Sequence, residues 1–125
     1  MGERHKLPAT RNSKTHHVVI TDTVNGGEYD LYIRTGYYDD GELGEVFVNI
    51  GKMGSTLQSM LDGWAMLVSV MLQYGIPLEE FSNRFVNSNF PPQGPTSDGK
   101  LCTSVFDYVM QYLLQESKAR AAPPA

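Results

Sequence analysis

The sequence predicts an α+β domain in which a three-stranded antiparallel meander is followed by two or three helices packed on one face. Three observations predict this class. Short β-branched segments come first and are joined by glycine-containing turns; the longest apolar stretch, residues 57–74, has helical spacing; and a proline-rich loop precedes a last amphipathic segment. With 125 residues, of which 41% are hydrophobic, the chain has room for a single core.

The strands come from the first half of the chain. Residues 15–23 are typical of a strand, and the Asn-Gly-Gly sequence that follows them predicts a tight hairpin turn, because these residues tolerate positive φ. Residues 28–38 predict a second strand. A turn at residues 39–42 then leads to a third strand at residues 43–50.

A long helix is expected next, with Ser55 or Thr56 as its N-cap and Gly75 at its end. One of its faces has the spacing of a buried face: Leu57, Met60, Leu61, Trp64, Leu67, Val68, Met71 and Leu72. A second stripe is polar or small but almost uncharged: Ser55, Ser59, Asp62, Met66, Ser69 and Gln73. Because solvated faces usually carry Lys and Glu, we expect a neighbouring element or another subunit to cover this stripe too.

The remainder predicts a shorter helix at residues 77–86, a loop at residues 87–100 that folds back on the domain, and a last helix. Thr103 or Ser104 caps this helix, which extends to about Gln115. The predicted domain thus spans residues 15–116. A basic extended arm (1–14) precedes it and a disordered tail (117–125) follows it.

Composition limits the classes of function. The net charge of −4 argues against nucleic acid as the general partner. Asp62 and several serines make residues 57–74 a poor membrane span, so no membrane partner is expected. Residues 1–17 lack the apolar region of a signal peptide. We therefore expect a cytoplasmic protein.

The best candidate site is the turn at residues 51–56. Its glycines allow close approach of the backbone, and the start of a helix offers free N–H groups with partial positive charge, which is how phosphate sites are built. The pattern is not that of a P-loop, and an ordinary strand-to-helix turn with a serine cap is the alternative. The predicted phosphate-binding residues are Lys52, Gly54, Ser55 and Thr56, with charge added by Arg11, His16 and Arg34.

No metal site is predicted, because the adjacent His16 and His17 point to opposite faces of a strand. A surface ion pair with Asp30 or Glu45 is the alternative role for Arg34.

Two further residues have a functional and an ordinary interpretation. Asp62 either holds Arg11 or Lys14 of the arm or is a surface carboxylate. The lone Cys102 has no partner at a spacing that supports nucleophilic catalysis, so no catalytic residue is predicted.

Several segments, in order, resemble one family: LPATR (7–11), THH (15–17), GYYDDG (36–41), GEVFV (44–48), KMGST (52–56), LQYGIPLE (72–79), RF (84–85), FPPQG (90–94) and SVFDYV (104–109). The pattern resembles the TSCPD domain, the C-terminal domain of vitamin B12-dependent (class II) ribonucleotide reductases. The resemblance implies a context of nucleotide reduction and a cytoplasmic location.

The resemblance does not imply reductase activity in this chain. In that family the substrate, cobalamin and radical-carrying cysteines belong to a large barrel upstream, so no cofactor is expected to bind here. The literal Thr-Ser-Cys-Pro-Asp sequence is replaced by Leu101-Cys102-Thr103-Ser104, and C-terminal cysteine pairs are missing, so the resemblance supports neither a redox relay nor a zinc site.

We therefore expect a stand-alone, non-catalytic accessory domain, from a phage or a split reductase, whose partner is a ribonucleotide reductase catalytic subunit. The alternative is a small oligomeric protein that sequesters or senses a nucleotide or phosphometabolite through the turn at residues 51–56. An enzyme that uses Cys102 or the histidines on a nucleotide is a third possibility. The small-residue stripe of the long helix also predicts a homo-oligomer.

Overall fold

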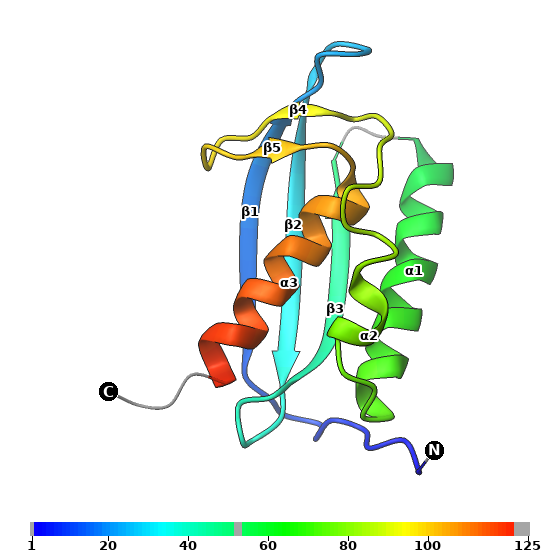
Figure 1. The fold of residues 1–125 in the computed structure, drawn as a ribbon, viewed down its shortest axis with the longest axis vertical. Coiled ribbons are helices and arrows are strands. Elements are labelled where there is room, and N and C mark those ends of the chain that lie inside the picture. The colour runs from blue at the N-terminus through cyan, green and yellow to red at the C-terminus, as the bar shows by residue number, and fades with distance from the viewer. Residues whose placement is uncertain (1, 52–53, 122–125) are drawn as a thin grey trace.

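A computed structural model describes residues 2–51 and 54–121, and it has the predicted α+β fold (Figure 1). A three-stranded antiparallel sheet has the order β1-β2-β3. Its strands are β1 (Ser13–Thr21), β2 (Glu28–Tyr37) and β3 (Leu43–Ile50). Gly26 and Gly27 have positive φ in the hairpin between β1 and β2, as the Asn-Gly-Gly sequence predicts.

Three helices and a small hairpin follow the sheet. They are α1 (Ser55–Gln73), α2 (Glu79–Ser82), β4 (Gly94–Pro95), β5 (Leu101–Cys102) and α3 (Val105–Ala121). The predicted helix at residues 77–86 is shortened to α2, because the residues after it continue as turns up to Asn87, which has a φ of 68°. The helical part of the C-terminus is longer than predicted and includes residues that the sequence assigned to a disordered tail.

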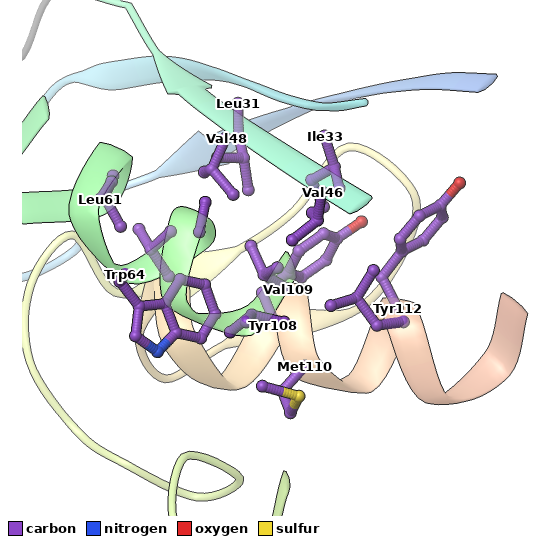
Figure 2. Close-up of a cluster of buried hydrophobic side chains, with 14 of the residues drawn as sticks. Leu31, Ile33, Val46, Val48, Leu61, Trp64, Tyr108, Val109, Met110 and Tyr112 are labelled. Carbon is purple, nitrogen blue, oxygen red and sulfur yellow. The ribbon is translucent and has the colours of Figure 1, made fainter. Parts of the chain in front are cut away.

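The core lies between one face of the sheet and the helices α1 and α3 (Figure 2). Alternate residues of each strand point into it, among them Ile33 and Val48, which are paired across β2 and β3. Trp64 of α1 stacks on Phe106 of α3, with 4.4 Å between the ring centroids. These aromatic contacts join the two long helices to each other as well as to the sheet.

Helix α1 lies along the outer edge of β3 (Figure 1), where side chains of the helix bind the strand's backbone. The Val46 N–H donates to Ser69 Oγ over 2.9 Å, and Gln73 Nε2 donates to the Gly44 carbonyl over 3.0 Å. Gln58 bonds both Ile50 N–H and the Val48 carbonyl, each at 3.0 Å. The helix therefore satisfies backbone groups of β3 that a fourth strand would otherwise pair.

This arrangement decides which faces of α1 are covered. Ser69 and Gln73, in the second stripe, are buried against β3, so a neighbouring element covers that part of the stripe as predicted. Met60 and Leu67, expected on the buried face, are exposed. The prediction was wrong for these two residues, because α1 lies beside the sheet edge and turns that side of the helix to solvent.

The loop at residues 87–100 folds back on the sheet, as predicted. The Ser97 N–H donates to the Val19 carbonyl over 2.9 Å, and the Thr23 N–H donates to the Gln93 carbonyl over 2.8 Å. Phe90 packs edge-on against Phe106, with centroids 5.2 Å apart. Ser104 caps α3, because its Oγ accepts from the Asp107 N–H over 2.9 Å.

The N-terminal arm is held against the domain at the end of the sheet where β3 begins. The His5 N–H donates to the Gln73 carbonyl over 2.8 Å, and the His5 ring stacks on Tyr38. Arg11 forms a bidentate ion pair with Glu45, at 2.5 and 2.9 Å. The basic charge of the arm is thus partly used within the fold.

Candidate functional site

The turn before α1 begins the helix one residue earlier than expected. Gly54 is the N-cap, with extended backbone (φ −64°, ψ 157°), and Ser55 is already helical. The predicted Ser55 or Thr56 cap is therefore wrong. Within the described part of the chain, no side chain caps α1, and Gly54, Ser55 and Thr56 are all exposed. The first N–H groups of the helix consequently face solvent. Lys52 lies outside the described residues.

The other predicted ligand residues do not converge on this turn. Arg11 lies beside Glu45 near the start of β3, whereas the turn follows Ile50. These two strand positions are on the order of 17 Å apart at 3.4 Å per residue. Arg34 projects from the solvent face of the sheet and lies over the Phe47 ring, 4.4 Å from its centroid. That phosphate binds at the turn stays a prediction.

The alternative expected for Arg34, an ion pair with Asp30 or Glu45, is not what the structure has. Asp30 accepts instead from His17 Nε2 over 2.7 Å, and Glu45 is bound by Arg11. Likewise Asp62 accepts from Gln58 over 2.7 Å and holds neither Arg11 nor Lys14. Lys14 pairs with Glu116 of α3 over 2.9 Å.

His16 points into the domain, opposite to His17, as strand alternation predicts. Its Nε2 donates to the Tyr108 hydroxyl oxygen over 2.8 Å, and that hydroxyl donates to Asp98 over 2.5 Å. Burial lowers the pKa of His16 more than the Asp98 carboxylate raises it. Burial and the bond to Asp98 raise the pKa of Tyr108. A neutral imidazole and an un-ionised phenol therefore hold the residue 96–100 turn onto β1 and α3.

Cys102 is fully buried, with its Sγ 3.7 Å from the Pro92 carbonyl oxygen. Burial raises the pKa of its thiol to about 12. Because the thiolate is the reactive form of cysteine, this side chain is not a nucleophile at neutral pH.

The outward side of α1 has an unusual composition for the exposed side of a helix. Three large apolar side chains on it are more than half exposed: Met60 (62%), Met66 (67%) and Leu67 (65%). Ser59, Gly63 and Tyr74 complete this side, which we call the open face of α1. None of these residues is charged, although the exposed side of a helix usually carries charge, and Asp62, at the margin of this face, is the single charged residue of α1. Exposed apolar side chains gathered on one side of a helix are typical of a binding site.

A groove runs between α1 and β3 next to the open face and has a volume of about 290 Å³. Phe47 and Met66 form its apolar walls, and Arg4, Glu45 and Asp62 lie at its polar margins. Arg4 is fixed by a 2.7 Å bond from its Nε to Gln73 Oε1, while Arg11 holds Glu45. The groove thus extends the open face with charged groups of defined position.

The sequence predicted only part of this surface: Ser59 and Met66 belong to the stripe expected to be covered by a neighbouring element or another subunit, whereas Met60 and Leu67 were expected in the core. A usable signal was present in Gln58, Ser69 and Gln73. These uncharged polar residues lie on one side of the helix, separated by about three turns and then by about one turn, and they mark the side that contacts β3.

The described residues include neither a metal-binding cluster nor a membrane-spanning helix. These residues contain no group of three or more His, Cys, Asp and Glu that could hold a metal ion. Their helices include none that is long and apolar enough to cross a membrane.

Comparison with known proteins gave one family. Residues 4–117 match the TSCPD domain. The vitamin B12-dependent ribonucleotide reductase of Bradyrhizobium diazoefficiens is 40% identical over 116 residues, which are 90% of this chain and 9% of that protein. The enzyme of the same name from Rhodopirellula baltica is 38% identical over 112 residues, 88% of this chain and 10% of that protein.

A third relative of that name, from Streptantibioticus cattleyicolor, is 39% identical over 112 residues, 88% of this chain and 18% of that protein. The chain therefore spans between about a tenth and a fifth of the length of these relatives. No solved structure matches it.

Proposed function

Because this chain belongs to the TSCPD domain family, we propose that it is a non-catalytic accessory domain that acts in the cytoplasm with the catalytic part of a vitamin B12-dependent ribonucleotide reductase. The relatives are named for that enzyme, and the similar stretch is a small part of each. In them the domain accompanies a much longer polypeptide. The same partnership is the simplest role for the domain in this chain.

The open face of α1 carries this proposal. Met60, Met66 and Leu67 are exposed to water at a cost of about 25 cal/mol for each Å² of apolar surface. A protein partner that covers them recovers this free energy. Methionine side chains are flexible and polarizable, and they adapt to the surface of a partner. We assign the open face as the contact with the catalytic part.

The proposal gives this chain no part in binding cobalamin. Two hollows along the described residues have volumes of about 520 and 290 Å³ and are open to solvent. A corrin ring with its side chains needs a far larger enclosed space. His16, the half-buried histidine, is already bound to Tyr108 and stacked on Tyr112. The described residues do not fit this cofactor, and no step of the proposal involves it here.

Binding to a purified vitamin B12-dependent ribonucleotide reductase catalytic chain from the same source tests the proposal. Leu67→Glu places a charge in the middle of the open face without touching the core. We expect it to weaken binding at least tenfold, which is about 1.4 kcal/mol. Isothermal titration calorimetry measures the change.

Val24→Glu is the matched control. Val24 is also an exposed apolar residue (56%), but it lies in the hairpin between β1 and β2. We expect this variant to bind like the wild type. Equal affinity of Leu67→Glu and wild type, with both variants folded, would remove the open face from the proposal. Absence of binding by the wild type would overturn the partnership itself.

A second function, binding of a nucleotide or phosphometabolite in order to sequester or sense it, is favoured by a different observation. Ser55 and Thr56 begin α1 without a side-chain cap among the described residues. Their N–H groups are therefore available to an anion, and the helix dipole favours negative charge there.

Ser55→Pro tests this second function with nucleoside mono-, di- and triphosphates as probes. Proline at the first helical position removes one N–H group and is compatible with a helix. Ser55→Ala, which keeps the N–H group, is the matched control. If phosphate binds here, Ser55→Pro loses affinity and Ser55→Ala does not, in calorimetric titrations. Equal loss in both variants, or no binding by the wild type, would reject the site.

A further inference from the structure

The two edges of the sheet differ in whether another element hydrogen-bonds to their backbone. The edge at β3 is closed by Gln58, Ser69 and Gln73 of α1. The edge at β1 lies on the far side of the sheet from α1 (Figure 1). The last turns of α3 cross the face of the sheet near the lower part of β1, but among the described residues no helix bonds to the backbone along this edge. In β1 the even-numbered residues bond to β2, as the bond from Asp22 N–H to the Gly27 carbonyl shows. The N–H and C=O groups of the odd-numbered residues therefore point outward.

Only the upper part of this outer edge is covered. Ser97 takes both backbone groups of Val19: its Oγ accepts from the Val19 N–H over 2.8 Å, and its own N–H donates to the Val19 carbonyl over 2.9 Å. Before Val19 in the sequence, the outward-pointing backbone N–H and C=O groups belong to Ser13, Thr15 and His17. In the described part of the chain, no other segment bonds to them. They form an open strand edge, which we call the free edge of β1.

We propose that the free edge of β1 pairs with the free edge of a second copy of this chain, antiparallel and about a two-fold axis at Thr15. Among antiparallel pairings of β1 with itself, this register uses every outward group of the free edge. Thr15 faces Thr15, and Ser13 faces His17 in each direction. Each of these residue pairs exchanges two backbone hydrogen bonds. The two sheets become one continuous six-stranded sheet.

The side chains of this register are self-complementary. On the solvent face, threonine meets threonine and serine meets imidazole, which are favourable or neutral cross-strand pairs. On the helix face Lys14 meets His16. Lys14 is already paired with Glu116 over 2.9 Å, and burial lowers the pKa of His16, so that no two like charges face each other. A second copy of β1 is therefore a suitable partner strand for this edge.

Neither end of the free edge, residues 13–17, is obstructed by the hairpin or the arm, so a paired strand of the same length can lie along it. Ser97 limits it next to Val19. At the other end Asn12, whose carbonyl accepts from the Tyr37 N–H over 3.0 Å, turns the arm toward Arg11 and Glu45 and away from the edge. The paired strand of the second copy therefore meets neither the hairpin nor the arm.

An apolar contact lies beside this edge. Leu101 is 66% exposed and borders a hollow of about 280 Å³. Tyr108 and Tyr112 line this hollow together with the polar residues Lys100, Asp107, Gln111 and Gln115. Because His16 of β1 stacks on Tyr112 with 4.5 Å between the centroids, the hollow lies over the β1 side of the sheet. Leu101 is the side chain here that can add apolar area to an interface of backbone hydrogen bonds.

Charge reversal at the axis tests the proposal directly and independently of any reductase partner. Thr15 is exposed, so Thr15→Glu and Thr15→Lys leave the core untouched. Each variant alone places two like charges opposite each other at the axis. We expect the dimer dissociation constant of each to rise at least tenfold in sedimentation equilibrium. An equimolar mixture of the two should form a heterodimer that native mass spectrometry identifies by its mass.

Thr15→Gln is the matched control, since it has the length of glutamate without the charge, and we expect it to dimerise like the wild type. Circular dichroism checks that every variant is folded. A wild-type protein that stays monomeric at the highest concentration measured would overturn the proposal. So would variants that dimerise unchanged, or a mixture that does not restore the dimer, since the interface would then lie elsewhere.

Discussion

At the scale of single residues, space and backbone conformation decide which glycines are required. Gly94 has a φ of +150°, and a Cβ atom there would lie 2.0 Å from the Thr21 carbonyl oxygen. This close approach lets the hairpin of β4 and β5 lie against β1. Gly63, in the middle of α1, has nothing within 4 Å of the same position. The two glycines therefore differ in kind, although the sequence alone does not distinguish them.

The first prediction uses this pair. Gly94→Ala should destabilise the protein by about 2 kcal/mol or more, because it adds a steric clash with fixed backbone to a strained φ. Gly63→Ala should stabilise it by about 1 kcal/mol, through higher helix propensity. Urea denaturation measures both. If the two variants changed the free energy of unfolding equally, the backbone at Thr21 would have to shift at little cost to accommodate the added methyl group.

The second prediction concerns His16. Burial lowers its pKa below 6.5 in the folded protein, so the unfolded state binds the proton more readily. Stability should therefore fall as the pH falls through 6.5, and the loss should be complete below the folded pKa. Replacement by glutamine, His16→Gln, should reduce this dependence in urea denaturation measured from pH 7 to pH 5. The same slope in both proteins would contradict it.

At the scale of elements, periodicity predicted the meander and the start of both long helices within a few residues, but α3 extends to Ala121, beyond its predicted end at about Gln115. Periodicity could not predict how α1 docks, because a helix with apolar residues on more than one side can turn any of them inward. Contact with the free backbone of β3 decided the orientation: Ser69 and Gln73 turned inward, and Leu67 was left outside. The two-residue strands β4 and β5 pair with each other and depend on packing against β1 and α3, and they have no sequence signal of their own.

The third prediction tests the contact between α1 and β3. Ser69→Ala leaves the buried Val46 N–H without an acceptor and should cost about 1–3 kcal/mol of stability. Ser59→Ala, on the exposed side of the same helix, should change stability by less than about 0.5 kcal/mol. Thermal or urea unfolding compares the two. A Ser69→Ala variant as stable as Ser59→Ala would mean that the helix does not close the strand edge.

At the scale of the whole molecule, the surfaces divide into three regions. The open face of α1, the start of α1 and the free edge of β1 lie on different elements. The sequence identified the start of α1 from its glycines. It could not assemble the residues around it, because the arm carries Arg11 to Glu45 and Arg34 lies on the solvent face of β2, over the Phe47 ring. Surfaces made by the docking of elements, such as the open face, arise only in the folded chain.

The central claim is that the open face of α1 binds the reductase catalytic chain, and methyl NMR tests it most directly. With ¹³C-methyl methionine, the signals of Met60 and Met66 report on the open face. That of Met110, which is fully buried in the core, serves as an internal reference. Titration with the catalytic chain should shift or broaden the Met60 and Met66 signals before that of Met110. A saturated complex in which these two signals are unchanged would contradict the claim.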